Sequence, residues 1–136
     1  MKRIMAVCVG MMFCGMVIAA PPASVKSFEE NLAGAISPCS EMGFKNIQAG
    51  SEAIVSGTDA IIACKEQAKL KGAELYKVFA ANIKDAQFKA DAKSMFSAWV
   101  AYVGIVTGSL DDGDSREFTA YRLASSMLET DELTAK

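Results

Sequence analysis

Residues 109–115 have the composition best suited to binding chemistry, because several aspartates stand there beside Gly113. Acidic side chains and a glycine in a loop are typical of calcium sites, but the twelve-residue calcium loop needs ligands at alternate positions and a late glutamate. This segment lacks that spacing, so we expect no metal ion and interpret it as a contact for a partner protein. The residues assigned to this contact are Leu110, Asp111, Asp112 and Asp114.

The chain contains no histidine, which limits the reactions it could catalyse. Cys–His catalysis, the Ser-His-Asp triad and the zinc sites that depend on imidazole are all excluded. No pattern in the sequence brings two carboxylates together as in a glycosidase. We therefore expect no catalytic residue, no cofactor and no enzymatic activity.

Residues 1–19 resemble a secretory signal peptide. Lys2 and Arg3 precede an uncharged apolar run over residues 4–18, and small residues follow at a cleavage position near Ala19 or Ala20. The alternatives are a retained membrane anchor and a lipoprotein modified at Cys14, for which Phe13 stands where a small residue is needed. We expect cleavage, a periplasmic or secreted location with no membrane attachment afterwards, and one domain over residues 20–136.

Export determines which cysteines can pair, because only Cys39 and Cys64 remain after cleavage. An even pair in an oxidising compartment predicts a disulfide, and the alternative is a reactive or metal-binding thiol. Loop closure over about 25 residues predicts a stabilisation of about 3.5 kcal/mol.

Charge restricts the class of partner. Removal of Lys2 and Arg3 from the 14 basic residues leaves 12 against 16 acidic residues, a net charge of −4. A nucleic-acid partner would require a basic surface, so none is expected. A basic protein partner fits better, because opposite charges steer association.

The elements that must position these residues are helices. Apolar residues recur at helical spacing over residues 59–106, with a polar hinge at residues 82–87, and predict a helical hairpin as the centre of a small all-α bundle. Trp99 and Tyr102 fit either its core or a recognition pair. Gly72 in the first helix predicts close approach of another helix. The outward face of that helix carries Lys65, Glu66, Lys69, Lys71, Glu74 and Lys77, with pairs at 66–69 and 74–77.

Shorter helices are expected on both sides of the hairpin. A capping box from Ser27 to Glu30 predicts a helix with Phe28, Leu32 and Ile36 buried, ending before Pro38. A second short helix is expected over residues 51–55, followed by a cap at Thr58 or Asp59 for the long helix. Asp114 and Glu117 predict a capping box that opens a last helix over residues 115–128, with a frayed tail over residues 129–136.

Three short motifs resemble the LprI-type lysozyme-inhibitor family of small exported helical proteins. The first corresponds to the family's E-L-N-x-x-Y segment, the second to its W-x-x-Y pair and the third to its T-x-x-R. The matching residues are Glu74, Leu75 and Phe79, then Trp99 and Tyr102, then Thr119 and Arg122. Cys64 also lies near the family's cysteine ahead of the first motif. The resemblance implies a helical exported domain and, for some members, inhibition of lysozyme.

These observations lead to one expected function and two alternatives. We expect an exported binding protein that inhibits lysozyme or a related cell-wall hydrolase, the basic enzyme being the partner of the acidic loop. The alternatives are an immunity protein that neutralises a periplasmic toxin and an envelope-stress protein without a fixed partner.

Overall fold

The computed structural model describes residues 23–134, except for the side chains of residues 51–57 and of Leu110. The described residues form four α-helices and one short 3₁₀ helix, and they include no strand. The all-α prediction is therefore confirmed. The elements are α1 (Val25–Ala49), α2 (Ser51–Ala81), α3 (Ala86–Ile105), η1 (Leu110–Asp114) and α4 (Arg116–Thr134).

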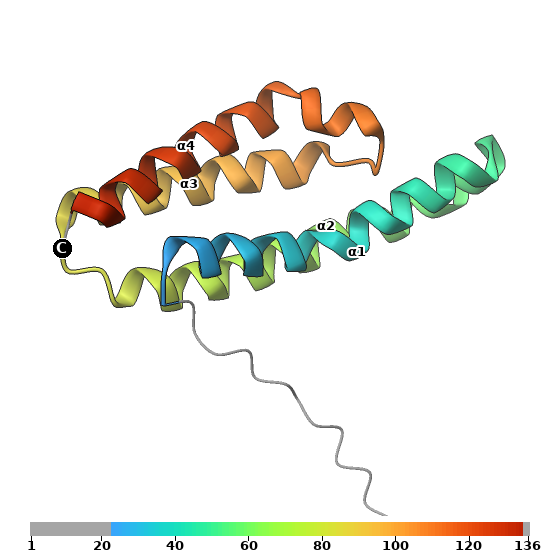
Figure 1. Ribbon diagram of the computed structural model, residues 1–136. Coiled ribbons are helices and arrows are strands. Elements are labelled where there is room, and N and C mark those ends of the chain that lie inside the picture. The colour runs from blue at the N-terminus through green and yellow to red at the C-terminus, as the bar shows by residue number, and fades with distance from the viewer. Residues whose placement is uncertain (1–22, 135–136) are drawn as a thin grey trace, which may run out of the picture.

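The helices form two antiparallel pairs, one lying over the other (Figure 1). α1 packs mainly against α2 and α3 packs mainly against α4, whereas α2 and α3 share a smaller contact. The expected hairpin of α2 and α3 exists, joined through residues 82–85, but it links the two pairs and does not form the main packing unit. Figure 1 also shows that the α1–α2 end extends past the turn after α3.

α1 differs from its predicted form at both ends. Ser24 is its N-cap and forms a capping box with Ser27, so the box predicted from Ser27 to Glu30 is wrong. The predicted end before Pro38 is also wrong, because α1 continues through Pro38 to Ala49. A proline inside a helix costs about 3 kcal/mol. Buried residues on both sides of Pro38, including Ile36 and Cys39, supply packing that offsets this cost.

α2 is one continuous helix from Ser51, so the separate short helix over residues 51–55 and the cap at Thr58 or Asp59 are wrong. Gly50 alone connects α1 to α2. Its φ of 95° lies in the left-handed region, which glycine adopts without strain. A glycine within a helix costs only about 1 kcal/mol, so Gly57 does not end a helix that packs along α1.

α4 begins one residue later than predicted and extends further. Ser115 caps it, because its Oγ accepts a hydrogen bond from Phe118 N at 3.1 Å. The predicted capping box of Asp114 and Glu117 is therefore wrong. The tail predicted to fray is helical as far as Thr134. In this last turn Glu132 Oε1 accepts a hydrogen bond from Val25 N at 3.2 Å, which joins the end of α4 to the start of α1.

Trp99 lies at the centre of the core, with 1% of its surface exposed. A Cβ atom on Gly72 of α2 would clash with the Trp99 ring, so the predicted close approach to Gly72 is confirmed, and α3 provides it. The predicted apolar stripe of α1 is buried as well. Phe28 stacks on Phe79 of α2 with ring centroids 4.5 Å apart.

The disulfide prediction is confirmed. Cys39 and Cys64 are bonded, with their Cα atoms 5.6 Å apart. The bond joins α1 to α2 one residue after Pro38, and Cys39 is buried in the core. It therefore holds the α1–α2 pair together on the side of Pro38 that leads to the extended end.

Two predictions about export and membranes concern different parts of the chain. The signal peptide assigned to residues 1–19 lies outside the described residues. Among the helices of residues 23–134, none combines the length and the apolar character needed to cross a membrane.

Candidate functional site

The acidic segment lies at the extended end of the bundle and is held by Asp112. Oδ2 of Asp112 accepts hydrogen bonds from the backbone N–H groups of Thr107 (2.9 Å) and Gly108 (2.7 Å). Oδ1 accepts a third bond from the Thr107 hydroxyl at 2.9 Å. Hydrogen bonds to an ionised carboxylate are stronger than those between neutral groups. Asp112, predicted as a partner contact, therefore also fixes the turn between α3 and η1.

This turn packs directly on α1. A Cβ on Gly43 would overlap the backbone carbonyl of Thr107, and one on Gly108 would overlap the backbone of α1 at Ser40 and Phe44. Gly108 also has a φ of 80°, which favours glycine. The two glycines allow the turn to contact the helix backbone, a role that their spacing in the sequence does not reveal.

The other predicted contact residues lie around this turn. Asp111 and Asp114 are exposed, and within the described part of the chain neither carboxylate has a hydrogen bond or an ion pair. Leu110 is the first residue of η1, and its side chain is outside the described set. The structure thus places Asp111 and Asp114 together, available to solvent, beside the occupied carboxylate of Asp112.

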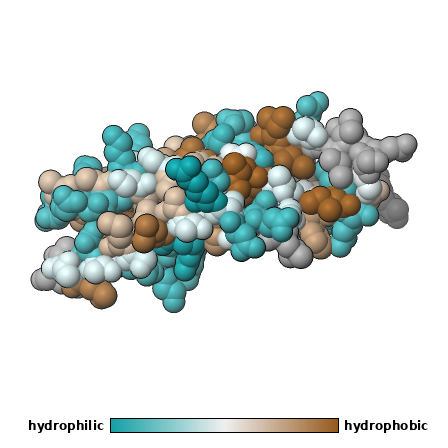
Figure 2. Space-filling view, turned by 90° about the horizontal axis from the view of Figure 1, so that it is seen from above, coloured by the Kyte–Doolittle hydropathy of each residue, from teal (hydrophilic) through white to brown (hydrophobic). Residues whose placement is uncertain are grey.

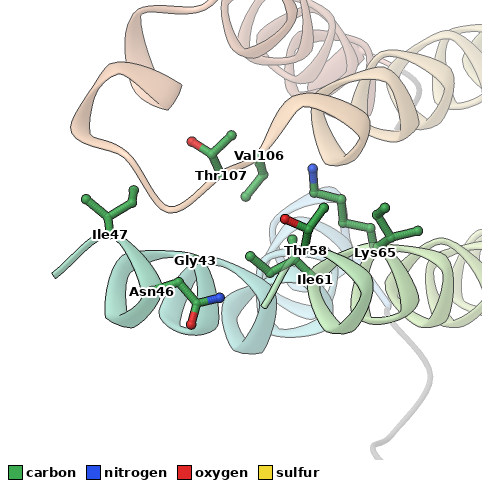
Figure 3. A pocket seen from close by; sticks show the side chains of 9 residues that line it. Gly43, Asn46, Ile47, Thr58, Ile61, Lys65, Val106 and Thr107 are labelled. Atoms are coloured by element: carbon green, nitrogen blue, oxygen red, sulfur yellow. The ribbon is translucent and has the colours of Figure 1, made fainter. Parts of the chain in front are cut away.

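A groove of about 220 Å³ lies next to the turn (Figure 3). Its walls come from α1, α2 and the end of α3, and its surface is mainly apolar. The lining residues used below are Gly43, Asn46, Ile61, Lys65, Val106 and Thr107. Thr107 lines the groove and is hydrogen-bonded to Asp112 of the acidic segment, so the two features adjoin, and we call them together the groove end.

Lys65 closes one side of the groove. Figure 3 shows it extending from α2 toward the end of α3, where its Nζ donates a hydrogen bond to the carbonyl oxygen of Gly104 at 3.0 Å. Burial lowers the pKa of Lys65, while Asp112 opposes this shift and Lys69 adds to it. Lys65, predicted on a solvated outer face, therefore lies partly buried beside the groove, while its hydrogen bond stays exposed to solvent. The predicted pair of Glu66 and Lys69 on that face is confirmed at 2.8 Å.

Asn46 contributes an unpaired polar atom to the groove. Its Nδ2 is buried and has no hydrogen-bond partner among the described residues. A buried donor left without an acceptor costs about 1–3 kcal/mol. The atom is closed off from solvent, so a ligand in the groove meets it only after the wall rearranges.

Exposed apolar side chains also surround the groove end. Phe44 and Ile47 of α1 are 46% and 45% exposed, and Ile62 of α2 is 54% exposed. Elsewhere the apolar surface is divided: on the face shown in Figure 2, hydrophobic patches alternate with hydrophilic ones. Mixed apolar and charged surface around a groove is typical of protein interfaces.

The motif residues that carry the family resemblance are not gathered in one place. On α2, Glu74 is exposed, Leu75 packs at the edge of the core and Phe79 is buried. On α4, Thr119 is exposed and its hydroxyl bonds to the Ser115 carbonyl at 3.1 Å.

The remaining motif residues, Trp99, Tyr102 and Arg122, line a second pocket between α1, α3 and α4. Sequence reasoning missed Glu29 and Glu30, which α1 adds to this pocket. Phe118 and Tyr121 of α4 line it as well, although the sequence suggested them only as apolar residues of the last helix.

Within residues 23–134 no group of three or more cysteine, aspartate or glutamate side chains is arranged to hold a metal ion. Comparisons with protein-family models, with curated proteins and with solved structures found no match to this chain.

Proposed function

We propose that this chain is an exported binding protein that inhibits lysozyme or a related cell-wall hydrolase, and that the groove end makes the contact. The observation that carries the proposal is the apolar groove beside two unpaired carboxylates, Asp111 and Asp114. Interfaces of tight complexes combine a central apolar pocket with charged groups around it.

The groove suits an anchoring side chain. A volume of 220 Å³ equals about seven water molecules at roughly 30 Å³ each, enough for one large apolar side chain of a partner. Phe44, Ile47 and Ile62 would then be covered by the partner, which removes their apolar surface from water.

The charges favour a basic partner. The chain without residues 1–19 has 12 basic and 16 acidic residues, and the exposed carboxylates of Asp111 and Asp114 stand at the rim of the groove end. Rim charges of this kind mainly raise the association rate and give it a strong dependence on salt. A hydrolase with arginine and lysine residues around its cleft would be attracted to these carboxylates.

Hydrogen bonds and a disulfide cross-link the scaffold behind the groove end, which favours tight binding. Asp112 fixes the turn with three hydrogen bonds, and the disulfide joins the two helices that carry the other walls. A surface that is already ordered loses less conformational entropy on binding. A partner side chain can therefore enter the groove at low entropic cost.

The proposal is tested by measuring lysis of bacterial cell walls by several lysozyme types in the presence of purified residues 20–136. We expect submicromolar inhibition of at least one type. Asp111→Lys and Asp114→Lys should each weaken inhibition about tenfold and reduce its salt dependence.

Glu129→Lys provides the matched control, because Glu129 is exposed on α4, away from the groove and from the three motifs, and the substitution changes the net charge by the same amount. Its inhibition constant should equal that of the unmodified chain. Equal losses from all three substitutions would refute a contact at the groove end. The absence of inhibition against every lysozyme type would refute the function itself.

A further inference from the structure

The outward side of α4 carries large apolar side chains that no part of the described chain covers. Leu123, Met127 and Leu133 are 63%, 55% and 75% exposed. The core side of the helix carries the buried residues Tyr121 and Leu128, and α4 lies on the outside of the bundle in Figure 1. The residues opposite the core side recur every three or four positions and are exposed. We call them the α4 outer face, which consists of Thr119, Leu123, Ser126, Met127, Thr130 and Leu133.

The threonines of this face already have acceptors for their hydroxyl groups. Oγ1 of Thr119 donates to the Ser115 carbonyl at 3.1 Å, and Oγ1 of Thr130 donates to the Ser126 carbonyl at 2.9 Å. Each acceptor lies one turn earlier in the same helix, so the threonine methyl groups are left for apolar contacts. A polar group that keeps its partner can be buried without the cost of an unsatisfied donor. The α4 outer face can therefore be covered without leaving these two hydroxyls unpaired.

The spacing of the face is that of a helix that pairs with another helix. Thr119, Leu123, Ser126, Thr130 and Leu133 step alternately by four and three residues, and none of them is charged. This is the spacing of the inner positions of a coiled coil. The core side of α4 packs separately on α3 and α1. A helix with apolar positions on both sides is typically covered on both sides.

Charges beside the face identify the partner. Arg122 and Glu129 stand seven residues apart and therefore flank the face on the same side. Arg116 and Asp131 flank it on the other side, again with the base before the acid. Within the described residues no ion pair involves any of these four groups. A second copy of α4 in antiparallel orientation would set base beside acid on both sides, whereas a parallel copy would set like charges together.

The charged pairs and the apolar residues share one centre. The midpoints of residues 122 and 129, of residues 123 and 127, and of residues 116 and 131 are 125.5, 125 and 123.5 in residue number. They agree within two residues, which is about 3 Å along a helix. A two-fold axis at this level would therefore bring both kinds of charged pair together and place Leu123 of each copy on Met127 of the other.

We propose that the α4 outer face binds a second copy of this chain and forms an antiparallel, two-fold symmetric dimer. Leu123 and Met127 of the two copies pack at the centre, and Leu133 of each copy packs against Thr119 of the second copy at the ends. A stable dimer buries about 800 Å² on each chain, which is more than one helix face supplies. The dimer therefore exchanges with the monomer, with an expected Kd of about 10–100 µM.

Pairing is independent of the proposed inhibition, because the outer face lies on α4 whereas the groove is formed by α1, α2 and the end of α3. Submicromolar inhibition is expected at concentrations where the chain is a monomer. A variant that abolishes pairing should therefore inhibit as the unmodified chain does, so the two proposals fail separately.

Sedimentation equilibrium of residues 20–136 tests the proposal. Between about 1 and 500 µM the average mass should rise from that of one chain towards that of two. Leu123→Glu places a charge at the centre of the dimer and should weaken pairing at least tenfold. Leu70→Glu is the matched control, because Leu70 is 61% exposed on α2 and the same substitution there should leave the Kd unchanged.

Cross-linking tests the orientation. Ser126→Cys places a thiol beside the two-fold axis, so two copies should form a disulfide when oxidised glutathione takes up the two electrons. Thr119→Cys lies on the same face, but in the antiparallel dimer the two thiols are about 20 Å apart along the helices and should not join. Parallel pairing would join both variants equally.

Charge reversal tests the ion pairs. Arg122→Glu should weaken pairing about fivefold, and adding Glu129→Arg should restore it. A double variant as weak as the single one would overturn the ion pair, and equal cross-linking of the two cysteine variants would overturn the antiparallel arrangement. The dimer itself is overturned if the unmodified chain stays a monomer up to about 500 µM, or if Leu70→Glu weakens pairing as much as Leu123→Glu.

Discussion

Replacing Asp112 tests whether one carboxylate holds the turn between α3 and η1. The Asp112→Ala variant loses three hydrogen bonds of 2.7–2.9 Å, two of them from backbone N–H groups. A hydrogen bond to a charged group contributes about 1.5–3 kcal/mol when it is buried. Because Thr107 is exposed, water replaces part of each bond, and we expect a total loss of about 2–3 kcal/mol in the free energy of unfolding.

The assay is a thermal melt followed by circular dichroism. For a chain of this size, 1 kcal/mol corresponds to about 4 °C in Tm, so Asp112→Ala should melt about 10 °C below the unmodified chain. Asp112→Asn should lose only about 1 kcal/mol. Its amide oxygen can still accept from the two backbone groups, and its amide nitrogen can donate to the Thr107 hydroxyl.

Asp111→Ala is the control, because its carboxylate has no partner among the described residues and its removal should change stability by less than about 0.5 kcal/mol. If Asp112→Ala melted within 2 °C of the unmodified chain, as judged against the roughly 10 °C expected, Asp112 would not hold the turn. If Asp111→Ala lowered the melting temperature as much as Asp112→Ala, the effect would come from the change in net charge and not from the hydrogen bonds of Asp112.

Three further predictions concern stability. Replacing Cys39 and Cys64 with alanine should lower the free energy of unfolding by about 3.5 kcal/mol, measured by urea denaturation; an unchanged midpoint would contradict the loop-closure argument. Gly72→Ala places a methyl group against the buried indole and should cost about 1–2 kcal/mol, whereas Gly34→Ala, with open space around it, should stabilise by about 0.5–1 kcal/mol; similar melting points for the two would refute the close-approach argument. Glu29 has a pKa raised above its ordinary 4.5 by burial, so the folded chain holds this proton more tightly than the unfolded chain. The associated stability is complete below pH 4.5 and is lost as the pH rises through the raised value, so Glu29→Gln should increase stability at pH 7 relative to pH 4 in urea melts at both pH values; an equal effect at both would exclude the shift.

Much of the fold could be predicted because local rules and tertiary packing agree over most of the chain. The stripe of Phe28, Leu32 and Ile36 has helical spacing and is buried. The disulfide of Cys39 and Cys64 required only an even count of cysteines and an oxidising compartment, and the structure contains it.

The errors arose where packing outweighs a local rule. Pro38 disfavours helix in the residue before it, yet α1 passes through because the residues on both sides pack against α2. The tail after Leu128 is polar and predicted to fray, but Glu132 bonds to Val25, a residue 107 positions away. No short-range pattern carries such information.

For the candidate site too, local patterns predict some features, and tertiary packing decides the others. The aspartates of residues 109–115 were identified from composition, but composition does not distinguish Asp112, whose oxygens are occupied, from Asp111 and Asp114, whose oxygens are not. The second pocket, between α1, α3 and α4, was missed because Glu29 and Tyr121 come from opposite ends of the chain. Only the packing of α1 against α4 brings them together.

The bond between Glu132 and Val25 has a consequence for the timing of folding. A chain is synthesised from its amino end, so α1 emerges from the ribosome long before the residue that completes its first turn. The N–H of Val25 gains that acceptor only after Glu132 has also emerged. Among the described helices, the one that is synthesised first therefore receives this contact at its start last.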